Sequence, residues 1–421
     1  MRYSIEWHDD AINAAAEERA SAADLKLFLQ DRNATLHSRG HESADHVTIA
    51  LYGLAEGLAH DWWNLFGGRD REVSLVKYRN GYIVPDIRMA FDGAAFEISA
   101  RSYEHHNPDL RFYEIGVEVM NRGDAEQTLG GFIEETLKRL DDRGVGRTGA
   151  ALRWTRVQES RADADEAAFC EAAGALGLDP YQISDQHADV IERAASLFDG
   201  EMLTEYLAGI QGAAAQPLFD WIDSAEARPA DEARLADLRA IAGETIASTD
   251  ARDGERGWAL GYRRARTFRR TLRLSESDAF HAYGDLAIKL GAGSRYALAG
   301  RVDGLRALRS DHSDGVYIHL RDHGISAATE QSHLFSFTRA VGDAVCFPTE
   351  TRAPINELKA AHRQAAGRAF AAEFLAPIGE IRSMRDDGRD DVTIADRFGV
   401  STEVIRRQWE NRDRIEAACA A

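Results

Sequence analysis

The chain has 421 residues, and its hydrophobic content of 44% and aromatic content of 9% are typical of a folded globular protein, which excludes a disordered chain. No apolar run approaches the length needed to cross a bilayer, and no signal-peptide core follows Met1, so we expect a cytoplasmic protein with no membrane partner. The net charge of −19 disfavours nonspecific contact with nucleic acid, and three widely spaced cysteines fit neither a disulfide framework nor a cysteine zinc site.

Residues 1–150 mix short apolar runs with a few amphipathic stretches, which predicts a small α+β domain. The predicted strands cover 47–51, 73–76, 95–99 and 113–119, and the predicted helices cover 54–66 and 128–142. Trp62 and Trp63 are adjacent on the first of these helices, where neighbouring side chains point about 100° apart. We favour burial of both indoles over the alternative, in which one of them forms an exposed binding anchor.

Residues 151–250 are predicted to be mostly helical, and no catalytic motif occurs among them. The predicted helices cover 159–176, 185–197, 201–210 and 234–247. We interpret this region as a spacer or interaction module. The best candidate for a linker is 227–232, where Pro229 would start a new helix, and a further boundary is expected near 250–254.

The run 335–345 has the helical frame of a zinc-binding H-E-x-x-H motif without its zinc ligands. A zinc peptidase needs two histidines four residues apart, and a glutamate beside the first of them to activate the metal-bound water. Arg339 stands at the first histidine position, Ala340 at the glutamate position and Asp343 at the second histidine position. A guanidinium cannot bind zinc and a methyl group cannot act as a base, so we predict no metal, no cofactor and no catalytic residue.

This run and a second one at 368–377 resemble the ImmA/IrrE family of metallopeptidases. In that family F-T-x-A-H-E-x-x-H precedes E-A-N-x-F-A-A-E-x-L-x-P. The resemblance extends over 257–421 and implies a mostly helical, zincin-like fold. It also places the third zinc ligand at Ala366 and the family's asparagine at Arg368, so this half of the metal site would be absent as well.

Removal of the metal chemistry would leave a cleft, and the resemblance implies that Arg339, Asp343 and Arg368 line it. Arg339 and Asp343 are four residues apart on the predicted helix and are candidates for an ion pair. One interpretation is that they are ordinary surface charges. The other is a pocket for a ligand or a protein partner, in which the arginine binds an anion.

The stretch 392–409 reads as a helix-turn-helix, with a turn at Gly399 and an N-cap at Ser401. If the second helix entered the major groove of DNA, the contacting residues would be Ser401, Thr402, Arg406 and Arg407. We favour a structural helix pair, because the ImmA/IrrE pattern ends with a similar segment.

These observations predict an α+β multidomain protein with an N-terminal α+β domain (1–150), a helical spacer (151–250) and an ImmA/IrrE-like pseudo-peptidase domain (251–421). The expected function is non-catalytic regulation or sensing through a protein partner or small ligand, in a bacterial stress, phage-defence or mobile-element circuit. A DNA-binding regulator that uses 392–409 is the alternative, and an unrelated enzyme site in 1–150 stays open. The sequence also leaves self-association open.

Overall fold

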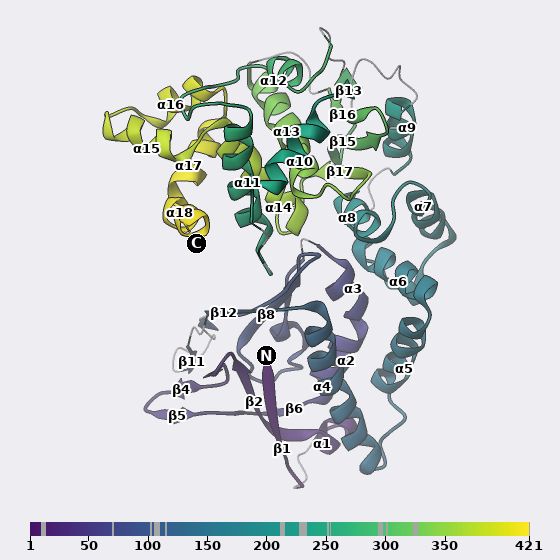
Figure 1. The fold of residues 1–421 in the computed structure, drawn as a ribbon. Coiled ribbons are helices and arrows are strands. Elements are labelled where there is room, and N and C mark those ends of the chain that lie inside the picture. Colours follow the sequence, from purple (N-terminus) through teal and green to yellow (C-terminus); the bar gives the residue numbers. More distant parts are fainter. Residues whose placement is uncertain are drawn as a thin grey trace. The chain divides into compact units, whose positions relative to one another are not determined.

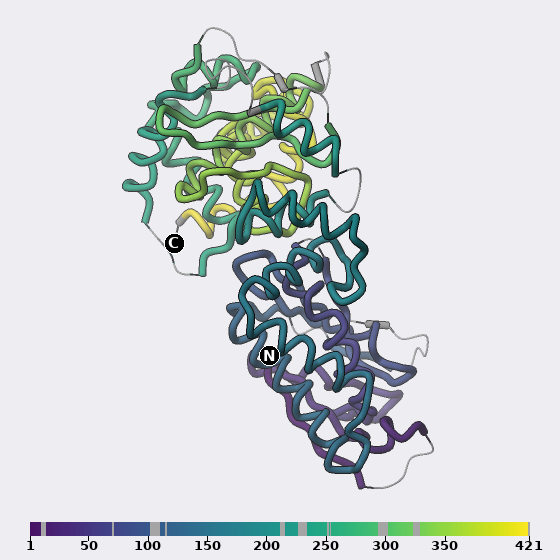
Figure 2. Tube along the Cα trace, turned by 90° about the vertical axis from the view of Figure 1, so that its right-hand side faces the viewer, coloured from purple at the N-terminus to yellow at the C-terminus, as the bar shows by residue number. Residues whose placement is uncertain are grey.

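The structure is a computed structural model, and it describes residues 1–9, 14–69, 71–101, 103–104, 110–113, 116–210, 215–226, 234–250, 252, 254–293, 298–299, 302–322 and 327–420. The chain forms two compact units, residues 1–193 and residues 194–421. Purple to blue marks most of the first unit, and teal to yellow marks the second (Figure 1 and Figure 2).

Among its described residues, the first unit contains three antiparallel four-stranded sheets. The first sheet contains β1 (Arg2–Trp7), β2 (Ala22–Leu29), β3 (Arg32–Asn33) and β6 (Val47–Ala50). The second contains β4 (His37–Arg39), β5 (Glu42–Ala44), β10 (Tyr103–Glu104) and β11 (Leu110–Phe112). The third contains β7 (Val73–Ser74), β8 (Asp86–Phe91), β9 (Phe96–Arg101) and β12 (Gly116–Met120). Leu25, Leu27 and Leu29 alternate with less buried residues on β2, because one face of its pleat packs on the core.

The helices of the first unit pack on these sheets and on one another, and they bury both tryptophans of the tandem pair. The helices are α1 (Ala16–Ala20), α2 (Tyr52–His60), α3 (Trp62–Gly67), α4 (Arg122–Asp142), α5 (Gly149–Ala162) and α6 (Ala164–Leu176), with short 3-10 turns η1 (Leu75–Tyr78) and η2 (Pro180–Gln182). Helix α7 (Asp185–Ala195) follows and contains the boundary between the units. Trp62 packs edge-on against Trp154, whereas the Trp63 indole donates a hydrogen bond of 3.1 Å to the Tyr181 hydroxyl. Both indoles are buried, so the expected burial is confirmed.

Three local predictions for this unit need correction, and one of them is the helix expected over 159–176, which is divided between α5 and α6 at Asp163. The helix expected over 54–66 is two helices, α2 and α3, which meet at Asp61. The strand expected over 73–76 ends at Ser74, because the Ser74 hydroxyl accepts a hydrogen bond from the Val76 N–H and starts the turn η1. The strands expected over 47–51 and 95–99 correspond to β6 and β9.

The boundary between the units lies inside the predicted spacer, not at 150 or 250. Trp154, Val157 and Cys170 of α5 and α6 join the apolar core of the first unit. Leu238 and Ala242, by contrast, join the core of the second unit. An amphipathic helix packs where its apolar face is buried. The helices of 151–250 are therefore divided between the cores of the two units. The predicted linker 227–232 lies outside the described residues.

The second unit packs helices around one five-stranded sheet with the order β13-β16-β15-β17, in which β14 pairs in parallel with β16. Its strands are β13 (Arg234–Leu235), β14 (Leu298–Ala299), β15 (Leu305–His312), β16 (Gly315–Arg321) and β17 (Arg352–Asn356). Its helices before the sheet are α8 (Gly200–Ile210), α9 (Ala215–Glu226), α10 (Leu238–Ala247), α11 (Gly257–Thr271) and α12 (Tyr283–Lys289). The later helices are α13 (Ala327–Cys346), α14 (His362–Leu375), α15 (Ile378–Asp386), α16 (Asp391–Phe398), α17 (Thr402–Glu410) and α18 (Arg412–Ala420).

Helix α14 lies against both α11 and α13. Arg339 and Asp343 are on α13, and Arg368 is on α14. Gly261 of α11 permits the close approach, because a Cβ at this position would lie 2.2 Å from the backbone oxygen of Ala366. Phe268, Phe337, Phe370 and Phe374 fill the core between the helices and are fully buried. With sheets prominent in the first unit and helices in the second, the predicted α+β class is confirmed.

Within the described residues, none of the helices combines the length and apolar character needed to span a bilayer.

Candidate functional site

Arg339 and Asp343 lie on α13, and both are buried in the second unit. The exposed fraction is 4% for Arg339 and 1% for Asp343. The interpretation of these residues as surface charges is therefore wrong. The reason is that α13 lies between α14 and the sheet, so this turn of the helix faces protein and not water.

Asp343 is held by two arginines from other elements. Arg309 of β15 donates a hydrogen bond of 2.7 Å to Asp343 Oδ2, and Arg363 of α14 donates to Oδ1. Arg309 is itself fully buried and also forms an ion pair of 2.9 Å with Asp311. The described residues contain no ion pair between Arg339 and Asp343, so the candidate i,i+4 pair is absent and Asp343 bonds to Arg309 and Arg363 in its place.

Arg339 binds neutral oxygens. Its Nη2 atom donates 2.6 Å hydrogen bonds to the backbone oxygen of Asn356 and to the side-chain oxygen of Gln364. Burial, together with the nearby guanidiniums of Arg368 and Arg306, lowers the pKa of Arg339 well below its usual range. In the part of the chain that the structure describes, Arg339 forms no ion pair, and its Nε atom is buried without a hydrogen-bond partner.

Helix α8 supplies an acidic residue to the same region, although the sequence offered no reason to connect them. Glu205 of α8 is 4% exposed and accepts a hydrogen bond of 2.6 Å from Gln364. Its backbone oxygen accepts a further bond of 3.1 Å from the Asn356 side chain, and Arg363 lies 3.9 Å from its carboxylate. We call the set Glu205, Arg309, Arg339, Asp343, Arg363 and Gln364 the buried polar network. Its members come from α8, β15, α13 and α14. Because these elements are far apart in the sequence, no local motif predicts the network.

A cavity of about 500 Å³ lies beside this network, and we call it the arginine cavity. Its lining includes four arginines: Arg306, Arg339, Arg368 and Arg407. Arg306 pairs with Glu357, and Arg407 pairs with Glu403 at 2.6 Å. The Arg368 guanidinium donates a hydrogen bond of 2.6 Å to the backbone oxygen of Lys359. Of the three predicted cleft residues, the cavity therefore brings Arg339 and Arg368 together, whereas Asp343 lies in the network and does not line it.

The predicted helix-turn-helix segment forms two packed helices, α16 and α17, around a left-handed Gly399 with φ of 62°. Ser401 precedes α17, but its side chain forms no capping hydrogen bond and lines the arginine cavity. Thr402 is exposed at the start of α17. Arg406 and Arg407 are exposed as well, and both donate to Glu403. Ser401 is at the N-cap position of α17 as predicted, but the expected capping hydrogen bond from its side chain is absent. The predicted pair of packed helices is present as α16 and α17.

The residues at the metal position that the ImmA/IrrE resemblance implies do not suit a zinc ion. Both Asp343 oxygens accept hydrogen bonds from arginines, and the Arg339 guanidinium offers hydrogen-bond donors and no zinc ligand. Ala366, at the position that the resemblance assigns to the third ligand, is buried and carries no donor atom. No group of three or more metal-binding side chains occurs among the residues that the structure describes.

We therefore expect the purified protein to contain less than stoichiometric zinc, and a chelator to leave its unfolding temperature unchanged. Elemental analysis combined with thermal denaturation, with and without chelator, measures both quantities. One bound zinc per chain, or a clear loss of stability on chelation, would contradict the interpretation of this site.

Comparison with family models, with curated proteins and with solved structures yielded no match. The ImmA/IrrE resemblance therefore stays a prediction that depends on the two sequence runs alone.

Proposed function

We propose that this protein is a non-catalytic regulator or sensor, and that its second unit binds an anionic group of a protein partner or small ligand. The circuit implied by the resemblance is a bacterial stress response, phage defence or a mobile element. The binding position is the arginine cavity, where Arg339 and Arg368 meet. Within 251–421 the scaffold would be that of a degenerate zincin-like domain.

The observation that carries this proposal is the state of Arg339. A buried guanidinium loses its hydration, and it normally recovers that cost by pairing with a carboxylate. Arg339 has two neutral acceptors, and the Arg368 and Arg306 guanidiniums are close enough to lower its pKa. A bound anion in the cavity would compensate for this excess of positive charge. Guanidinium groups also suit carboxylates and phosphates, because their planar donors bind two oxygens at once.

The residues of α13 around Arg339 do not support peptide cleavage. Hydrolysis of this type needs an activated water and a general base close to it. Ala340 stands where the base would be, and the single carboxylate on this turn of α13, Asp343, is occupied by Arg309 and Arg363. The scaffold is then used for binding alone.

Calorimetric titration of the full chain with inorganic phosphate at low ionic strength tests the anion site directly. We expect saturable binding that weakens at least about tenfold in Arg368→Gln, since a hydrogen bond to a charged group contributes roughly 1.5–3 kcal/mol. Arg382→Gln is the matched control, because Arg382 pairs with Glu416 and does not line the arginine cavity. Absence of saturable binding, or equal loss in both variants, would refute the proposal.

DNA binding through α17 is the weaker alternative. Glu403 lies in the first turn of α17 and neutralises Arg406 and Arg407 by ion pairs, and it would repel phosphates from the helix end that has to enter the groove. Fluorescence anisotropy with a mixed-sequence duplex is expected to show no saturable binding at physiological salt. Tight binding with a steep salt dependence that is lost in Arg406→Gln would favour this alternative.

A further inference from the structure

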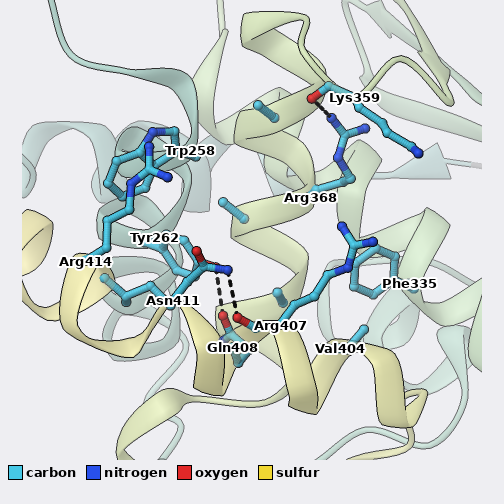
Figure 3. A pocket seen from close by; sticks show the side chains of 14 residues that line it. Trp258, Tyr262, Phe335, Lys359, Arg368, Val404, Arg407, Gln408, Asn411 and Arg414 are labelled. Carbon is cyan, nitrogen blue, oxygen red and sulfur yellow. Dashed lines mark hydrogen bonds between the residues drawn. The ribbon is translucent and has the colours of Figure 1, made fainter. Parts of the chain in front are cut away.

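A second cavity opens next to the arginine cavity and is lined by aromatic and cationic side chains (Figure 3). We call it the aromatic cavity. Its volume is about 380 Å³, within the range of roughly 300–1,000 Å³ that is typical of small-molecule sites. Trp258 and Tyr262 of α11 and Phe335 of α13 contribute the three aromatic rings. Such walls suit a flat, apolar surface on the ligand.

The charges around the aromatic cavity all have one sign. Its charged residues are Lys359, Arg368, Arg407 and Arg414, and among the described residues no aspartate or glutamate lines it. This contrasts with the chain as a whole, whose net charge is −19. Arg414 forms no ion pair in the described part of the chain, and its guanidinium lies 4.0 Å from the centroid of the Trp258 ring. The cavity therefore concentrates positive charge beside aromatic surfaces, a combination that favours an anion.

Hydrogen bonds hold one wall of the aromatic cavity in place. The Tyr262 hydroxyl donates a bond of 2.7 Å to the Gln408 side-chain oxygen. The Gln408 amide nitrogen in turn donates to the backbone oxygen of Ala376 at 3.1 Å and to Glu373 at 3.2 Å. Because Gln408 is 1% exposed, Tyr262 is fixed by a buried partner. A wall that is ordered in advance lowers the entropy cost of binding a rigid ligand.

Arg368 and Arg407 line both cavities, and so does Phe335. An anionic group that contacts Arg368 would therefore lie where the two cavities meet, beside the ion pair of Arg407 with Glu403. A ring attached to that group would extend toward Trp258, Tyr262 and Arg414. The shared residues explain how a single molecule can use the charge of one cavity and the aromatic walls of the other.

We propose that the ligand of the second unit is a small planar aromatic anion, with its carboxylate or phosphate at Arg368 and its ring in the aromatic cavity. This inference depends on the proposed anion-binding function and narrows it to one chemical class. An aromatic carboxylate and a mononucleotide share this chemistry, and they differ in the anionic group and in the ring system.

Titration calorimetry of the full chain with four probes tests the inference. The probes are 2-naphthoate, the neutral 2-naphthylmethanol, acetate and adenosine monophosphate. We expect at least one of the two aromatic anions to bind at least about tenfold more tightly than acetate, and 2-naphthylmethanol to bind at least about tenfold more weakly than that anion. Tighter binding of 2-naphthoate would indicate an aromatic carboxylate as the ligand, and tighter binding of adenosine monophosphate would indicate a mononucleotide.

Two neighbouring arginines of α18 provide a matched pair of variants. Arg414→Gln removes the cation beside Trp258, and Arg412→Gln changes a residue that stacks on Trp409 and lines neither cavity. We expect binding of the aromatic anion to fall several-fold in the first variant and to stay unchanged in the second. The thermal unfolding of both variants is measured in parallel, so that a loss of folding is recognised.

Each contrary result has a distinct meaning. Equal binding of acetate and of both aromatic anions, or equal effects of the two arginine variants, overturns the aromatic site and leaves the anion site in place. Absence of binding by inorganic phosphate and by all four probes overturns the proposed function together with this inference.

Discussion

Replacing Asp343 with alanine is expected to lower the free energy of unfolding by about 3–5 kcal/mol, the range observed when one partner of a buried ion pair is removed. Asp343 is 1% exposed and bonds to Arg309 and Arg363, both buried. Without the carboxylate, two guanidiniums would stay in the interior without their main compensating charge. Urea denaturation of the full chain, followed by circular dichroism, measures the change.

Glu403→Gln is the control for this experiment. Glu403 also binds two arginines, Arg406 and Arg407, but the side chains of those arginines are 60% and 65% exposed. Solvent screens exposed ion pairs, so the expected loss is less than about 1 kcal/mol. If Asp343→Ala were as stable as Glu403→Gln, the buried polar network would not stabilise the fold.

Replacing Gly261 with alanine is expected to destabilise the second unit by about 1–3 kcal/mol, the usual cost of overpacking. The added methyl group would lie 2.2 Å from the Ala366 backbone oxygen and 2.9 Å from the Ala369 Cβ atom. Helices α11 and α14 would have to separate, because a backbone oxygen cannot rotate away. Since Trp258 and Tyr262 lie on α11, we also expect weaker binding of the aromatic anion at a temperature where the variant is folded.

Gly243→Ala provides the opposite control within the same unit. Gly243 lies in α10, and a Cβ at this position would meet no atom within 4 Å. Alanine there should stabilise the protein by roughly 0.5–1 kcal/mol, because glycine in a helix interior loses more conformational entropy on folding. Thermal and urea unfolding of both variants are compared. Equal and small effects would show that the α11–α14 contact tolerates separation.

The local elements could largely be predicted from the sequence. Periodic apolar residues predicted β6, β9 and α4, and the run 335–345 lies within α13. Local rules failed at Asp61, where one expected helix is two, and at Ser74, where a side-chain hydrogen bond ends a strand. These breaks depend on single side chains, which the periodicity of a longer window does not register.

The candidate site could be predicted only in part. Arg339 and Arg368 were identified from the aligned frames of the two helices, and they do line one cavity. Trp258 and Arg414 were not identified, because their contact joins α11 to α18 across a long stretch of sequence. An arginine in the first turn of a short helix such as α18 looks alike in sequence whether it faces solvent or a ring.

By itself, the sequence determined the secondary structure of the α13 segment and the absence of histidine and glutamate at the positions that a zinc peptidase requires. Both are properties of residues within one or two helical turns of each other. The tertiary structure alone decided that Asp343 pairs with residues 34 and 20 positions away, and that Glu205 reaches Gln364 from 159 positions away. Helical periodicity sets the direction in which a side chain leaves its own helix. Which partner it meets, and whether water reaches that partner, depends on how distant elements bury their apolar faces together.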